Sequence, residues 1–131
     1  MKKLISVKLA GNIVIVLMVL MIILHMLIML RIVPYDIVWG GQIKNDASLM
    51  KLEIFALVTL FIFLAIILVK VDYLKFTKFK KITNIAVWIM FVYFLLNTVL
   101  NLASGVTLEK LIFTPITIIL FVLIFRLAIE K

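Results

Sequence analysis

Four long apolar runs constrain this chain more than any other feature of its sequence. Short polar segments separate the runs, which cover about residues 9–30, 49–69, 82–103 and 108–129. A helix rises about 1.5 Å per residue, so the first run reaches about 33 Å, against about 30 Å for the hydrocarbon core of a bilayer. We therefore predict an all-α integral membrane protein, in which residues 1–131 form a single domain of four transmembrane helices.

The composition supports this class and excludes several others. Hydrophobic residues make up 67% of the chain, which is more apolar surface than the interior of a soluble domain of this size can hide. Cysteine is absent, so disulfides, thiolate catalysis and zinc–cysteine sites are excluded. A net charge of +8 would suit a nucleic acid, but the lysines flank apolar runs, where they contact anionic lipid. We expect the lipid bilayer as a partner, no nucleic acid and no cofactor.

The distribution of basic residues predicts the orientation in the membrane. If each apolar run crosses the bilayer, ten of the 14 Lys and Arg residues fall on one side and four on the other. The cytoplasmic side carries the excess of Lys and Arg, so we expect a multi-pass protein of the cell membrane, such as a bacterial inner membrane, with both termini in the cytoplasm. Short connections make neighbouring helices antiparallel, which predicts an antiparallel four-helix bundle. The ten residues are Lys2, Lys3, Lys8, Lys70, Lys75, Lys78, Lys80, Lys81, Arg126 and Lys131.

The segment between the first two runs is the richest in chemistry. Residues 31–53 contain a proline, a Gly-Gly pair, Tyr35, Trp39 and three acidic residues. Loops on a rigid scaffold often carry function, and this one is expected to be structured and to lie outside the cell. Asp36 offers a charge to a ligand and Trp39 a cation–π face. Alternatively, Asp36 caps a turn and Trp39 anchors the chain at the membrane interface.

Polar side chains within the runs fall at a similar depth, near the outer side. Polar groups in lipid are costly and usually face the interior of a bundle or a wet cavity. We therefore predict a polar pocket that opens outward beneath the loop. Its candidate ligand-binding residues within the runs are His25, Glu53, Asn97, Asn101 and Thr114, with Thr117 one turn further along.

Each of these residues also has a purely structural interpretation. His25 could donate to a backbone carbonyl or to Asn97, and Glu53 could stabilise the dipole of its helix. The two asparagines share a helix face and could join helices by hydrogen bonds. The threonine hydroxyls near Pro115 could bond to backbone carbonyls.

One face of the first run carries methionines at helical spacing together with His25. Met18, Met21 and Met29 would supply thioether groups, which suit Cu(I). Methionine is also an ordinary filler of irregular gaps in apolar cores, and the run is rich in it. We therefore predict packing here and no metal site.

Three functions fit these observations. The favoured one is a binding protein or transporter-type subunit for a small polar or cationic ligand. The second is a membrane partner, regulator or protective protein that acts through its outer loop, with Tyr35 and Trp39 as anchors. The third is a membrane enzyme in which Glu53 or Asp36 orients His25 as a base. No nucleophile motif accompanies these residues, so no catalytic residue is predicted; the sequence leaves the oligomeric state open.

Overall fold

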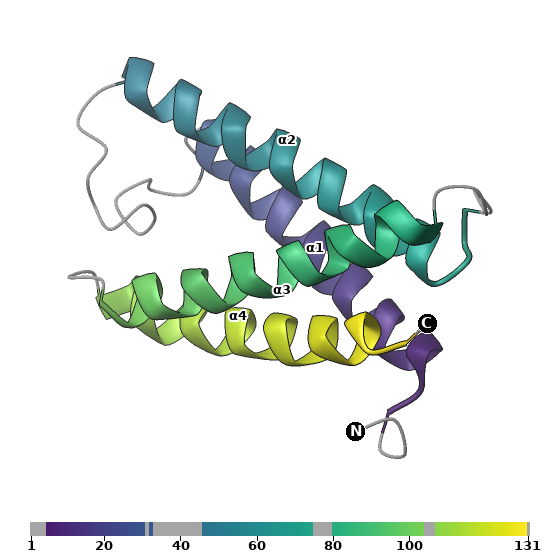
Figure 1. The fold of residues 1–131 in the computed structure, drawn as a ribbon. Coiled ribbons are helices and arrows are strands. Elements are labelled where there is room, and N and C mark those ends of the chain that lie inside the picture. Colours follow the sequence, from purple (N-terminus) through teal and green to yellow (C-terminus); the bar gives the residue numbers. More distant parts are fainter. Residues whose placement is uncertain (1–4, 31, 33–45, 75–79, 104–106, 131) are drawn as a thin grey trace.

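The computed structural model describes residues 5–30, 32, 46–74, 80–103 and 107–130. Within this part of the chain all regular structure is helical. Every helix is long and apolar enough to cross a membrane, as is typical of a multi-pass membrane protein. The helices are α1 (Val7–Met29), α2 (Asp46–Lys70), α3 (Lys80–Leu102) and α4 (Thr107–Ala128), shown in Figure 1.

Local chemistry explains where these helices begin and end. Before α1, the side chain of Ser6 accepts a hydrogen bond of 3.1 Å from the backbone N–H of Leu9, which satisfies one of the free donors of the first turn. After α2, Asp72 adopts a φ of 68°. Aspartate tolerates this left-handed conformation better than most residues, so the chain can turn sharply after Lys70.

The helices pack in a closed order. Contact is most extensive between α3 and α4, followed by α1 with α2; α1 also packs against α4, and α2 against α3. In Figure 1 the start of α1, the end of α2, the start of α3 and the end of α4 lie on one side of the molecule. We call this side the basic end, because it carries Lys70, Lys80 and Arg126. At the opposite end, α2 lies apart from α3 (Figure 1).

The main hydrophobic core lies toward the basic end and contains residues from every helix. It includes Met18 of α1, Ile67 of α2, Met90 of α3 and Ile124 of α4, all with 0% exposure. A smaller apolar cluster at the opposite end joins Ile28, Leu49 and Phe113, from α1, α2 and α4. Half of the span of α4 is buried, against 22–28% for the other three helices. Helix α4 is therefore the most buried of these helices, and the others present most of their apolar surface outward, as lipid requires.

Candidate functional site

The most unusual contact in the membrane-spanning part joins two ionisable side chains. Nδ1 of His25, on α1, lies 2.6 Å from Oε2 of Glu53, on α2. His25 is 8% exposed and Glu53 is fully buried, at 0%. Polar and charged groups at such positions are costly unless they are paired and hydrogen-bonded. The contact therefore explains how a carboxylate can be tolerated inside this apolar fold.

Helix periodicity and apolar packing bring the pair together. Ile28 follows His25 by three residues, so these two side chains share a face of α1. Leu49 precedes Glu53 by four residues, so these two share a face of α2. Ile28 and Leu49 pack together with Phe113 of α4. This small cluster fixes the rotation of α1 and α2 about their axes and directs the imidazole and the carboxylate toward each other.

Helix α4 adds a buried hydroxyl near the same level. Thr114 directly follows Phe113, and its Oγ1 is buried without a hydrogen-bond partner in the described structure. Thr117 is also buried, but its hydroxyl donates to the carbonyls of Phe113, at 2.9 Å, and Thr114, at 3.1 Å. The backbone interpretation is thus right for Thr117, whereas the hydroxyl of Thr114 keeps its hydrogen-bonding capacity unused. Buried polar atoms without a partner are uncommon in native structures.

The asparagines of α3 are not joined to the pair by hydrogen bonds in the part of the chain that the structure describes. Asn101 is buried and Asn97 is half-buried, but neither forms a hydrogen bond with His25 or Glu53 in the described structure. The partner of His25 is Glu53, not Asn97. The apolar cluster beside the pair also contains no buried residue of α3. The described geometry therefore supports a site of α1 and α2, flanked by α4.

Two predicted ligand residues, Asp36 and Trp39, lie outside the described residues, as do Tyr35 and the turn at residues 40–41. The methionine face of α1 is divided between two apolar clusters. Met18 belongs to the main core, whereas Met21 packs against the smaller cluster near His25. Among the described residues, no group of three or more His, Cys, Asp or Glu side chains could hold a metal ion.

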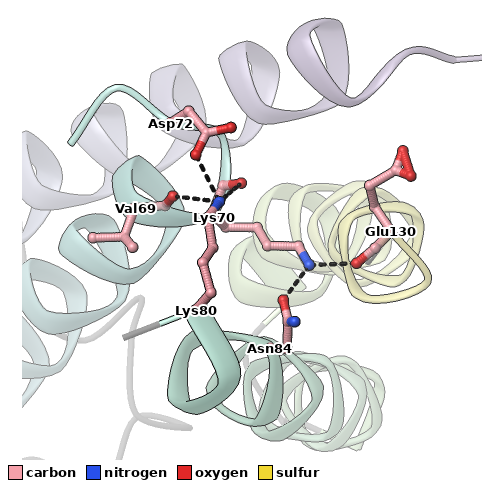
Figure 2. A network of polar contacts seen from close by, with 6 residues as sticks. All are labelled: Val69, Lys70, Asp72, Lys80, Asn84 and Glu130. Atoms are coloured by element: carbon pink, nitrogen blue, oxygen red, sulfur yellow. Dashed lines mark hydrogen bonds and ion pairs between the residues drawn. The ribbon is translucent and has the colours of Figure 1, made fainter. Parts of the chain in front are cut away.

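A polar network at the basic end was not foreseen from the sequence (Figure 2). Nζ of Lys70 donates to Oδ1 of Asn84 and to the backbone carbonyl of Glu130, each at 2.5 Å. Nζ of Lys80 lies 2.6 Å from Oδ1 of Asp72 and donates to the carbonyls of Val69 and Lys70, both at 3.3 Å. Lysine side chains therefore connect the end of α2 to the start of α3 and the end of α4.

Arg126 extends this network to the start of the chain. Its Nε donates to the carbonyl of Ile5 at 2.7 Å, and its Nη2 lies 3.6 Å from Oε1 of Glu130. Arg126 is only 3% exposed, and its Nη1 has no hydrogen-bond partner in the described structure. In the sequence, Arg126 lies near the end of the fourth apolar run. From composition alone it would be interpreted as a charge at the level of the lipid headgroups.

The fold and the site together define a class: a multi-pass membrane protein with an ionisable pair buried between two of its spanning helices. Comparisons with protein-family models, with curated proteins and with solved structures found no match for this chain. The function proposed below is therefore inferred from the geometry and the sequence.

Proposed function

We propose that this protein binds a small polar or cationic ligand at the His25–Glu53 pair, as a binding protein or a transporter-type subunit of the cell membrane. The observation that carries the proposal is the 2.6 Å contact between a fully buried carboxylate and a nearly buried imidazole. Ionisable residues within membrane spans are rare and usually mark a ligand, ion or proton pathway.

The chemistry of the flanking groups favours a cation. The carboxylate of Glu53 accepts hydrogen bonds and supplies negative charge. The hydroxyl of Thr114, on α4, is a further acceptor near the pair. Asp36 and Trp39, in the loop between α1 and α2, would add a second carboxylate and an aromatic face. These groups are the ones that a small cation requires.

The orientation supports access from outside the cell. The excess of Lys and Arg lies at the basic end, and by the positive-inside rule this end faces the cytoplasm. An antiparallel bundle with both termini inside then places the pair in the outer half of the membrane. The smaller apolar cluster beside the pair lies away from the basic end, and the larger core lies toward the basic end, which supports a proposed site that opens outward.

A thermal-unfolding series tests the proposal. The purified protein is mixed with sodium, potassium, choline or tetramethylammonium chloride, and N-methylglucamine chloride matches the ionic strength. A ligand at about 100 times its Kd stabilises the folded state by about 2.7 kcal/mol, which raises the unfolding temperature by several degrees. We expect at least one cation to stabilise the wild type and to have no such effect on Glu53→Gln.

Lys51→Gln is the matched control. Lys51 lies two residues from Glu53 on α2 but is exposed, so this change removes one charge from the same helical turn without touching the pair. It should retain the cation-induced stabilisation. If every cation acts equally on the wild type and on Glu53→Gln, the proposed site is wrong.

A further inference from the structure

We infer that an anionic phospholipid binds at the start of α1, with its phosphate beside Lys8 and one acyl chain in an apolar groove on this helix. We call it the α1 groove; it is lined by Asn12, Ile13, Val16 and Leu17. Basic residues at a membrane surface attract anionic lipid in general, whereas this site holds one lipid molecule in a defined place. It is separate from the buried pair between α1 and α2, and it goes beyond the proposed function because it does not depend on a cation at that pair.

The shape and lining of the α1 groove suit a hydrocarbon chain. Side chains four residues apart form the ridges of a helix surface, and the four lining residues belong to two neighbouring ridges. The groove has a volume of about 240 Å³, against about 30 Å³ for one water molecule in the liquid. Its accessible surface is almost entirely apolar, and ordered water needs several polar partners. A segment of an acyl chain therefore fits the groove better than water does.

Three polar side chains lie together where the α1 groove begins. Nζ of Lys8 lies 4.1 Å from the centroid of the Tyr73 ring, and the hydroxyl of Tyr73 donates to Oδ1 of Asn12 at 2.5 Å. Tyr73 thus holds the ammonium of Lys8 near a residue that lines the groove. Lys8 is exposed, and an ammonium over an aromatic face keeps N–H donors for a phosphate.

Asn12 carries an exposed amide on a face of α1 that is otherwise apolar. Leu9, Val16 and Leu20, on the same face, are each at least 50% exposed. Oδ1 of Asn12 accepts from Tyr73, whereas its Nδ2 forms no hydrogen bond with a described residue. A donor without a partner is costly in lipid. The ester and phosphate oxygens of a phospholipid are acceptors that would satisfy it.

The order of these groups along α1 matches the order of groups in a phospholipid. Asn12 lies four residues after Lys8 and Val16 eight residues after it, which is about 6 Å and 12 Å along the helix axis. A phospholipid presents its phosphate at the membrane surface, then its ester groups, then its acyl chains. With Lys8 at the level of the phosphates, the amide of Asn12 meets the ester region and the groove meets a chain.

The charges at the basic end favour an anionic lipid over a zwitterionic one. Lys8 forms no ion pair with a described residue. The described acids at this end, Asp72 and Glu130, lie beside basic side chains: Asp72 is 2.6 Å from Lys80, and Glu130 is 3.6 Å from Arg126. A phosphate at Lys8 therefore meets net positive charge, and a choline group there would be repelled.

Native mass spectrometry of the full chain in mild detergent tests the site. The protein is titrated with phosphatidylglycerol, with phosphatidylcholine of the same acyl chains, and with glycerol phosphate, which has the anionic group but no chains. Lys8→Gln removes the charge, and Val16→Trp fills the groove from an exposed position that is not part of the main core. The matched controls are Lys81→Gln and Ile89→Trp, which make the same changes at exposed positions of α3.

The expected result is that the first phosphatidylglycerol binds more tightly than phosphatidylcholine or glycerol phosphate. Lys8→Gln should weaken its binding about fivefold, the effect of one lysine on attraction to an anionic lipid surface, and Val16→Trp should also weaken it. Lys81→Gln and Ile89→Trp should bind this lipid as the wild type does. Equal binding of the two lipids overturns the inference, as does equal binding by either variant and its control. If glycerol phosphate binds as tightly as the lipid, the groove holds no acyl chain and the inference is wrong.

Discussion

At the scale of single residues, the central question is why a carboxylate and an imidazole are buried inside an apolar membrane fold. The 2.6 Å contact between Nδ1 of His25 and Oε2 of Glu53 offsets part of the free-energy cost of burying them, because each group gives the other a polar partner. A buried pair is nevertheless weak evidence for stability, because desolvation of both groups offsets most of their attraction. We therefore interpret the pair as the proposed binding site rather than as a source of stability.

A double-mutant cycle tests this view. His25→Leu leaves a buried carboxylate without its imidazole, and Glu53→Leu leaves a buried imidazole without its carboxylate. Loss of one partner of a buried pair typically costs about 3–5 kcal/mol, whereas replacing both by apolar residues is often neutral or stabilising. We expect each single variant to be less stable than the double variant. Equilibrium unfolding in mixed micelles measures the free energies.

The hydrogen bond between Tyr73 and Asn12, 2.5 Å long and exposed, is the matched control for this cycle. The changes Asn12→Leu and Tyr73→Phe should show a coupling of only about 0.6 kcal/mol, the average for interhelical hydrogen bonds in membrane proteins. If the His25 and Glu53 changes are simply additive, the pair is not an energetic unit and the proposed site is wrong.

At the scale of helices, a close approach joins the first part of α1 to the residue that follows α2. A Cβ placed on Gly11 would lie under 3.0 Å from Cγ1 of Val71 and 3.2 Å from its Cβ. Real Cβ atoms do not come so close to other atoms, and Val71 is itself buried in the main core. Glycine at position 11 therefore allows α1 to pack against the end of α2.

Gly11→Ala should consequently destabilise the protein although alanine favours helix formation. Overpacking typically costs about 1–3 kcal/mol, whereas alanine gains about 1 kcal/mol over glycine in a helix, so the net loss is up to about 2 kcal/mol. Equilibrium unfolding of the purified variant measures it. The loss should be smaller in a Val71→Ala background, which removes the clashing atoms. Val16→Ala, an exposed change on the same helix, should alter stability by less than about 0.5 kcal/mol.

The helices themselves were predictable because span length and apolar composition are local properties of the sequence. The depth of His25 and Glu53 was also predictable from their positions along the runs. The choice of Glu53 over Asn97 as the partner of His25 was not, because it depends on how each helix is rotated about its axis. Contacts between distant residues, such as Ile28, Leu49 and Phe113, set that rotation.

The network around Lys70 illustrates the same limit. In the sequence, Lys70 begins a segment rich in lysine, and such segments usually lie at the level of the lipid headgroups. In the structure it is 5% exposed and connects three helices through Asn84 and Glu130. Net charge and spacing along the chain do not distinguish a buried lysine from its exposed neighbours. Only the packing of the helix ends does.

At the scale of the whole molecule, the described contacts are unequal at the two ends. The main core and the Lys70 network join all four helices near the basic end. Toward the opposite end, the smaller cluster involves α1, α2 and α4, and Figure 1 shows α2 apart from α3 there. On the proposed function, the contacts at the basic end would close the site on that side of the membrane.

The proposed function also depends on which of these two ends faces the cytoplasm, and the cysteine-free chain makes this orientation measurable. Leu74, after α2, and Ala103, after α3, are both exposed, so single cysteines there report on opposite ends. Of the described Lys and Arg residues, Lys8, Lys70, Lys80, Lys81 and Arg126 lie at the basic end, so the positive-inside rule predicts that this end faces the cytoplasm. In intact cells, a membrane-impermeant maleimide should label Ala103→Cys, whereas Leu74→Cys should react only after permeabilisation. The reverse pattern would place the His25–Glu53 pair in the inner half of the membrane, and a ligand would then have to reach it from the cytoplasm.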